Sequence, residues 1–88
     1  MHTMSLEQNF KKACDEARKF TKRPPEKDIL EIYSLFKQAT VGDINKAKPS
    51  DVEGKTKWEA WNSKKGMSPK TAKEQYIKRV ESLSGTYK

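Results

Sequence analysis

YSLFKQATVGDIN (Tyr33–Asn45) is the segment that decides the fold. Aromatic and apolar side chains recur in it at helical intervals, and Gly42 is typical of the end of a helix. The stretch from Asp43 to Glu53 is rich in Gly, Asp, Asn, Pro and Ser, which predicts a long loop. KTKWEAWN (residues 55–62) follows that loop with two tryptophans three positions apart. Both segments interleave lysines with aromatic residues within single helical turns, so one surface can offer cations beside rings.

Outward from these segments, the pattern predicts four helices. The helix that contains Tyr33 is expected over residues 26–41, with Glu26 and Asp28 at the positive end of its dipole. A short helix is expected over residues 54–65, ended by Gly66. The buried side of the 26–41 helix is predicted to carry these residues: Ile29, Ile32, Tyr33, Phe36, Ala39 and Thr40.

The two outer helices are marked by capping residues and apolar stripes. Ser5 and Gln8 have capping-box spacing at the start of a helix over residues 6–20, which the prolines at 24–25 stop. Ser68 precedes Pro69 in the arrangement that favours a helix start, and this last helix runs to the C-terminus. The predicted stripes are Leu6, Phe10, Ala13, Cys14 and Ala17 in the first, and Ala72, Tyr76, Val80, Leu83 and Tyr87 in the last.

Length and composition limit the fold to one small helical domain over residues 1–88. The chain has 88 residues, the size of a single domain, and shows no β-branched alternation that would predict a sheet. Hydrophobic residues make up only 33% and charged residues 35%, so the core must be thin. We therefore expect an all-α protein, and nothing in the sequence requires more than a monomer.

The chain carries a formal charge of +7, which predicts attraction to polyanions. Nucleic acid, acidic lipid surfaces and phosphorylated small molecules remain open as partners on this evidence, and the charge can equally be that of ordinary solvated helices. No stretch approaches the length of a membrane span. The N-terminus lacks the apolar region of a secretory signal, so a cytoplasmic protein is expected.

The sequence argues against an enzyme. Its only histidine, His2, stands at the chain end, and its only cysteine, Cys14, lies on an apolar helical stripe. No Ser-His-Asp or Cys-His set can therefore be assembled, and metal ligands at useful spacing are missing. The glycines are too scattered for a phosphate-cradling loop. A non-catalytic binding protein without a metal or cofactor is the remaining class.

The two quoted segments, within a likeness that spans Phe10 to Tyr87, resemble the acyl-CoA-binding protein family. The resemblance implies a four-helix bundle of up-down-down-up topology. It also implies an intracellular carrier that binds medium- to long-chain fatty acyl-CoA esters, buffers them and delivers them transiently to acyl-CoA-using enzymes. A basic helical module for nucleic acid or a membrane surface is the alternative, although dispersed acidic residues leave no purely basic helix face.

The resemblance also implies which residues touch the ligand. Tyr33, Lys37 and Lys57 are expected at the 3′-phosphate of the nucleotide, and Arg18, Phe36 and Tyr76 around its adenine and ribose. Ile29, Leu30 and Ile32 would help to line the acyl groove. The full set expected in contact with acyl-CoA is Arg18, Tyr33, Ser34, Leu35, Phe36, Lys37, Lys57 and Tyr76.

Spacing alone also permits ordinary interpretations of these residues. Tyr33 can be a buried tyrosine beside a surface Lys37, Tyr76 a core tyrosine, and Arg18 a solvated charge at a helix end. Trp58 and Trp61 are predicted to pack in the core.

Two features depart from the family pattern. Phe36 stands where tyrosine is common, so a ring remains but a hydroxyl is lost. The loop at residues 49–54 is about two residues shorter than usual, and Val52 is its only apolar residue. Because this loop lies near the acyl region in relatives, the preferred chain length is open.

Overall fold

A computed structural model describes residues 5–87, and it consists of four helices joined by turns and one long loop. No strand occurs among these residues, so the predicted all-α class is confirmed. None of the described helices is both long enough and apolar enough to cross a membrane. His2 lies outside the described residues. The helices are α1 (Leu6–Arg18), α2 (Glu26–Thr40), α3 (Val52–Asn62) and α4 (Pro69–Tyr87).

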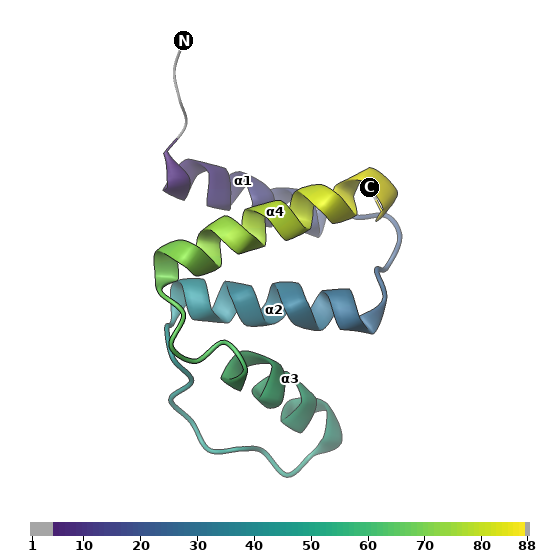
Figure 1. Cartoon of the computed structure of the whole chain (residues 1–88). Helices are drawn as coiled ribbons and strands as arrows, with labels where there is room; N and C mark the ends of the chain where they lie inside the picture. Colours follow the sequence, from purple (N-terminus) through teal and green to yellow (C-terminus); the bar gives the residue numbers. More distant parts are fainter. Residues whose placement is uncertain (1–4, 88) are drawn as a thin grey trace.

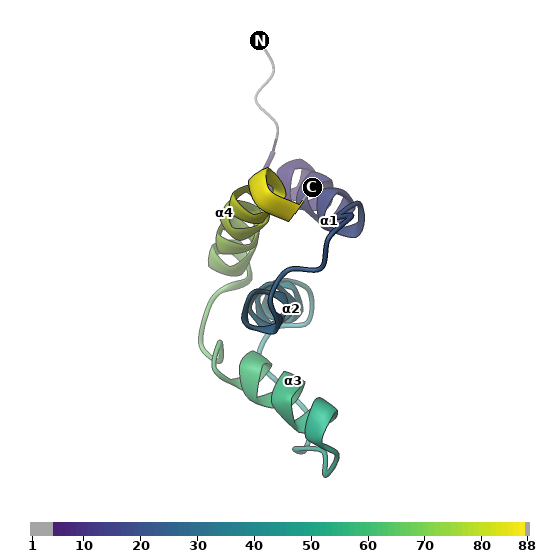
Figure 2. The ribbon, with the colours of Figure 1, turned by 90° about the vertical axis from the view of Figure 1, so that its right-hand side faces the viewer.

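The four helices have the expected up-down-down-up order. In Figure 1, α1 and α4 run from left to right, whereas α2 and α3 run from right to left. Helix α4 packs against both α1 and α2, and α3 packs only against α2. Figure 2, which looks along the helices, shows α3 on the far side of α2 from α1 and α4. Because α2 and α3 run in the same direction, the chain needs the long 41–51 connection to return to the starting end.

Local sequence fixes most of the helix ends. The Ser5–Gln8 capping box forms with both of its hydrogen bonds, and the Ser68 hydroxyl accepts from the Thr71 amide at 3.2 Å. Gly42 has a φ of +98°, and its amide donates to the Lys37 carbonyl, which closes the last turn of α2. These positions behave as the sequence predicted.

Helix α3 begins two residues before the expected start because Asp51 caps it. The Asp51 carboxylate accepts a hydrogen bond from the Gly54 amide at 2.8 Å. A Cβ atom at Gly54 would lie only 2.7 Å from that carboxylate, so glycine lets the cap approach closely. The helix also ends earlier than predicted, at Asn62, and residues 63–66 form turns.

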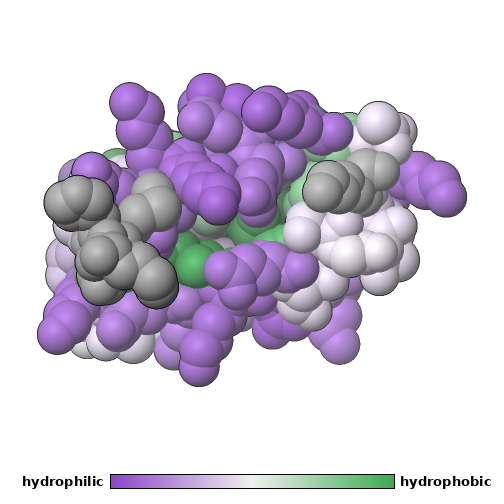
Figure 3. All heavy atoms as spheres, turned by 90° about the horizontal axis from the view of Figure 1, so that it is seen from above, coloured by the Kyte–Doolittle hydropathy of each residue, from purple (hydrophilic) through white to green (hydrophobic). Residues whose placement is uncertain are grey.

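The core is small, as the composition predicted. It is centred on α4. The rings of Phe10, Phe36 and Tyr76 meet there, with centroid separations of 5.1–6.1 Å. Figure 3 shows hydrophobic atoms in a central band between hydrophilic side chains on the face seen from above. The buried hydrophobic residues are Phe10, Ala13, Leu35, Ala39, Trp61, Ala72, Tyr76, Val80 and Leu83.

The predicted buried side of α2 is partly wrong. Thr40 is exposed, and its hydroxyl donates to the Phe36 carbonyl instead. The residues of α2 that are most deeply buried are Ser34, Leu35, Gln38 and Ala39, while Ile29, Ile32, Tyr33 and Phe36 are only half-buried. The reason is that α2 has neighbours on two sides, α3 and α4, so the side that meets them differs from the most apolar stripe.

Gln38 and Asp43 join the end of α2 to the turn before α4. The buried Gln38 amide donates to the Asp43 carboxylate and to the Met67 carbonyl, both at 2.8 Å. The same Asp43 oxygen accepts from the Gly66 amide at 2.8 Å. These donors, first the Gly66 amide and then Gln38, hold the pKa of the Asp43 carboxyl below its ordinary value.

We expect Asp43→Asn to lower the melting temperature at pH 7 and to lower it less at pH 2.5. A depressed folded-state pKa means that ionised Asp43 stabilises the fold above its unfolded pKa of about 3.9, and that this stabilisation is lost as the pH falls through the folded value. Thermal unfolding followed by circular dichroism at both pH values measures this. Glu74→Gln, an exposed change on α4, serves as the control. An equal melting deficit at both pH values would contradict the charge as the cause.

Candidate ligand-binding site

A hollow of about 280 Å³ opens between α1 and α2, over the side of α4. Among the described residues, α1 and α2 make no close backbone contact with each other, because each packs on α4 instead. The rings of Phe10 and Phe36 meet between the two helices, with their centroids 6.1 Å apart. The space left beside these rings is lined by Cys14, Ala17, Arg18, Ile29, Ile32, Tyr33, Phe36 and Tyr76.

The lining explains why the apolar stripe of α2 is not fully buried. Ile29, Ile32 and Phe36 line this open space, and each remains half-buried, although Phe36 also meets the rings of Phe10 and Tyr76. Only 33% of the residues are hydrophobic, so apolar side chains that stay outside the core reduce the apolar surface available to stabilise the fold. An apolar hollow with a few polar groups at its edge is the usual form of a small-molecule site.

Tyr76 lies in the hollow and in the core at once. Its ring is buried against Phe10, and its hydroxyl lies next to the thiol of Cys14, which also lines the hollow. Burial, with smaller contributions from Cys14, raises the pKa of Tyr76. Burial also raises the pKa of the Cys14 thiol, so this cysteine is not an activated nucleophile. The two groups form a neutral, polar spot within an otherwise apolar wall.

Tyr33 and Lys57 form the edge of the hollow that faces α3. The Lys57 ammonium lies 5.8 Å from the centre of the Tyr33 ring, which is a cation–π contact. The Glu53 carboxylate, one turn earlier on α3, pairs with the same ammonium at 3.7 Å. About half of the Lys57 side chain is exposed. Lys57 is therefore positioned but free to turn toward an anion at this edge.

Lys37 lies one helical turn beyond Tyr33 on α2. Its ammonium lies 5.5 Å from the centre of the Trp61 ring, and Trp61 is buried. The structure thus places Lys37 and Lys57 along the same α2–α3 edge, each against an aromatic ring. Arg18 lies across the hollow, at the end of α1, and its guanidinium is mostly exposed with Asp15 at 4.0 Å.

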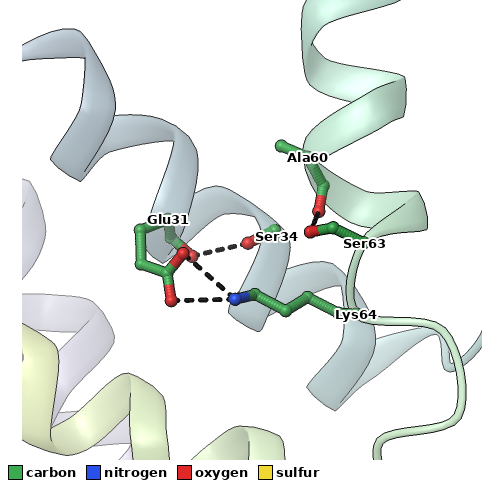
Figure 4. Close-up of polar contacts among 5 residues, drawn as sticks. All are labelled: Glu31, Ser34, Ala60, Ser63 and Lys64. Carbon is green, nitrogen blue, oxygen red and sulfur yellow. Dashed lines mark hydrogen bonds and ion pairs between the residues drawn. The ribbon is translucent and has the colours of Figure 1, made fainter.

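An ion pair just beyond the C-terminal end of α3 helps to hold this helix beside α2. Figure 4 shows Lys64, which follows α3, reaching across to Glu31 of α2. The Lys64 ammonium donates to both Glu31 carboxylate oxygens, at 2.9 and 3.0 Å. Both side chains are largely buried, so loss of either one would leave a poorly solvated charge. This ion pair helps to fix the position of α3, and therefore of Lys57, against α2.

Four of the eight residues expected at the ligand do not line this hollow. Lys37 and Lys57 lie beside it at the α2–α3 edge, whereas Ser34 and Leu35 are turned away from it. Ser34 and Leu35 are each only 1% exposed. The Ser34 hydroxyl donates to the Glu31 carbonyl within α2 (Figure 4). Leu35 belongs to the core and forms part of a second hollow on the α4 side of α2, together with Glu31, Gln75, Lys78, Arg79 and Ser82. That second hollow contains no aromatic ring.

The remaining expected residues are brought together. Arg18, Tyr33, Phe36 and Tyr76 all line the first hollow, and Lys37 and Lys57 lie along its α2–α3 edge. The sequence interpretation missed Cys14 and Ala17 as lining residues, because their helical spacing placed them on the core stripe of α1. Small side chains opposite bulky aromatic ones were the available signal, since they leave room above the rings.

The arrangement suits a ligand with two unlike parts. Aromatic and aliphatic side chains can cover an apolar or planar group, while cations at the edge can bind phosphate oxygens through charge-assisted hydrogen bonds. Within residues 5–87 there is no cluster of histidine, cysteine and carboxylate side chains that could hold a metal ion.

Comparison with known proteins gives a consistent result. Residues 7–80 match the family model described as "Acyl CoA binding protein". The chain is 45% identical over 84 residues to the acyl-CoA-binding protein homolog of Drosophila melanogaster, covering 93% of this chain and 98% of that protein.

Two solved structures are also similar. The crystal structure of acyl-CoA-binding protein 2 of Oryza sativa has a TM-score of 0.85 at 29% identity, covering 96% of this chain and all of that one. The solution structure of the acyl-CoA-binding protein of Babesia bovis T2Bo has a TM-score of 0.79 at 40% identity, covering 96% of this chain and 98% of that one.

Proposed function

Because the chain belongs to the acyl-CoA-binding protein family, we propose that it is a non-enzymatic carrier of medium- to long-chain fatty acyl-CoA esters. The observation that carries this proposal is the hollow between α1 and α2, whose aromatic lining adjoins two lysines at the α2–α3 edge. A nucleotide needs rings and cations in one place, and this edge of the hollow offers both.

The head group of the ligand would occupy the hollow. Phe36 and Tyr76 offer ring faces and edges to adenine, with Arg18 at the α1 side able to stack or to bind phosphate. The Tyr33 hydroxyl, Lys37 and Lys57 would hold the ribose 3′-phosphate. A phosphate with up to two negative charges gains strongly from cations in a partly covered cleft.

The acyl chain would lie along the apolar side of α2 toward the start of α3. Ile29, Leu30 and Ile32 are half-buried there and can cover methylene groups. The carrier would then keep both a detergent-like tail and a reactive thioester away from water. It would act in the cytoplasm as a monomer, buffering these esters and delivering them transiently to the enzymes that use them, with no cofactor.

We expect the ligand to protect Cys14 from alkylation. Cys14 is the only cysteine, and it lines the hollow. Saturating dodecanoyl-CoA should slow its modification by N-ethylmaleimide, followed by mass spectrometry. Adenosine 3′,5′-bisphosphate, which resembles the head group alone, should also protect at saturation, whereas dodecanoate should not. An unchanged rate under conditions where calorimetry detects dodecanoyl-CoA binding would place the site elsewhere.

The charge of +7 is the one observation that favours a nucleic-acid or membrane-surface module. The two functions differ in their response to salt. Affinity for DNA through phosphate contacts falls steeply and linearly with the logarithm of salt concentration. Affinity for an acyl-CoA should fall less, because burial of the tail does not depend on counterion release. Titrations with dodecanoyl-CoA and with a DNA duplex at two salt concentrations therefore distinguish them.

A further inference from the structure

The loop that follows α2 is fastened to α3 by both tryptophans. The Trp61 indole N–H donates to the Gly42 carbonyl at 2.9 Å, at the start of the loop. The Trp58 indole N–H donates to the Lys46 carbonyl at 2.8 Å, four residues later. These two hydrogen bonds hold the backbone of residues 42–46 against α3. The bond from Trp58 fixes the backbone of Lys46 itself.

Lys46 and Lys37 converge on a single ring. The Lys46 ammonium lies 5.9 Å from the centre of the Trp61 ring, and the Lys37 ammonium lies 5.5 Å from the same centre. Within residues 5–87, no ion pair joins either of them to a carboxylate. Two ammonium groups beside one ring, neither paired with a carboxylate, raise the local positive potential, which favours an incoming anion.

We propose that Lys46 is a further phosphate-binding residue that acts together with Lys37 on the ribose 3′-phosphate of the ligand. This inference rests on the proposed acyl-CoA binding, and it extends the row of cations at the α2–α3 edge beyond Lys57 and Lys37. Lys46 is exposed and has a flexible stem, so its ammonium can move from the ring to a phosphate oxygen.

Lys48 provides a matched control on the same loop. Its ammonium also lies against an indole, 5.7 Å from the centre of the Trp58 ring. Unlike Lys46, it has a carboxylate partner, Glu59, at 3.9 Å. Its charge is therefore already balanced, and it does not share a ring with Lys37. Both lysines lie on the same loop and contact an indole ring. They differ in that Lys46 has no carboxylate partner and shares its ring with Lys37.

The test compares dodecanoyl-CoA with its 3′-dephospho analogue by calorimetry. We expect Lys46→Ala to weaken binding of dodecanoyl-CoA roughly three- to tenfold, the effect of one partly exposed charge contact. The same variant should bind the 3′-dephospho ester as the unaltered protein does. Lys46→Arg, which keeps the charge, should retain most of the affinity for dodecanoyl-CoA, and Lys48→Ala should change neither affinity.

The possible outcomes distinguish a failure of the proposed role of Lys46 from a failure of the proposed carrier function. If the unaltered protein binds dodecanoyl-CoA but Lys46→Ala binds it equally well, the role of Lys46 is overturned while the carrier function stands. If Lys46→Ala weakens both esters equally, the residue acts on the loop and not on the 3′-phosphate, which also overturns the role. If the unaltered protein binds neither ester, the carrier function itself fails.

Discussion

Affinity for acyl-CoA esters should rise steeply from a C8 to a C12 chain and then level off toward C16. Each buried methylene is worth about 0.8 kcal/mol, so four more methylenes can add about 3 kcal/mol, or more than a hundredfold in affinity. This is the largest effect that we expect, because the tail is the part of the ligand with the most apolar surface. Calorimetric titration of C8, C12 and C16 esters, each below its micelle concentration, measures it.

The expected levelling has a structural reason at the start of α3. Val52 is the only apolar residue in the segment at residues 49–54, and it is 82% exposed. In the absence of a ligand, nothing apolar in this loop covers the end of the groove toward which the tail would extend. Methylenes that pass beyond the half-buried side chains of α2 would then remain in water and add little.

Two other patterns of affinity would contradict this account. Equal affinities for all three esters would refute an apolar groove altogether and leave the head group as the only anchor. A constant increment through C16 would show that the start of α3 does cover the distal chain, against the expectation from Val52. Adenosine 3′,5′-bisphosphate serves as the tail-free reference in the same titrations.

The sequence predicted the helices well because their signals are local. The Ser5–Gln8 box, the glycine at position 42 and the stripe of Ala72, Tyr76 and Val80 each act within one or two turns, and each has the predicted structure. Helix α4 also has a simple environment, since its buried stripe faces α1 and α2 together. Local pattern and tertiary packing agree in such a helix.

The prediction failed where packing came from distant parts of the chain. Gln38 is polar, yet it is buried because its amide reaches the loop at Asp43 and the turn at Met67. Both partners lie outside α2, so the local sequence pattern of the helix could not predict them. The isoleucines of α2 were expected both on its buried side and in a groove, and they are half-buried and line a hollow that is open because α1 packs on α4 and not on α2.

The candidate site was likewise predicted in part and missed in part. The resemblance selected Tyr33, Lys37 and Lys57, and the fold brings all three to one edge. It also selected Ser34 and Leu35, which are neighbours in sequence but project away from the hollow, as successive residues of a helix must. Lys46 could not be selected from spacing, because its position depends on the two indole hydrogen bonds to its loop.

Removal of the Lys57 ammonium should weaken binding of CoA esters without damage to the fold. We expect Lys57→Ala to reduce the free energy of binding by about 1–3 kcal/mol, the usual contribution of hydrogen bonds to a charged group. The side chain is nearly half exposed and takes no part in the core, so the melting temperature should change little. Calorimetry with dodecanoyl-CoA and thermal unfolding by circular dichroism provide the two readouts.

Glu53 can reduce the contribution of Lys57 to the free energy of binding, because it competes with the ligand for the Lys57 ammonium. In the unliganded protein it pairs with Lys57 at 3.7 Å, and a phosphate must compete with this carboxylate for the ammonium. Pairs this exposed contribute little, about 0–1 kcal/mol, so a doubly charged phosphate should win the competition. Glu53→Gln, which removes the competitor and keeps the ammonium, should therefore bind dodecanoyl-CoA at least as tightly as the unaltered protein.

Lys55→Ala is the matched control, because Lys55 is an exposed lysine two positions away on the same helix. Side chains two positions apart on a helix point in different directions, so Lys55 does not share the position of Lys57 against Tyr33. A general effect of net charge would weaken both variants equally, since each loses one positive charge. A loss confined to Lys57→Ala would mean that the ammonium acts at close range, whereas full affinity in that variant would remove Lys57 from the site.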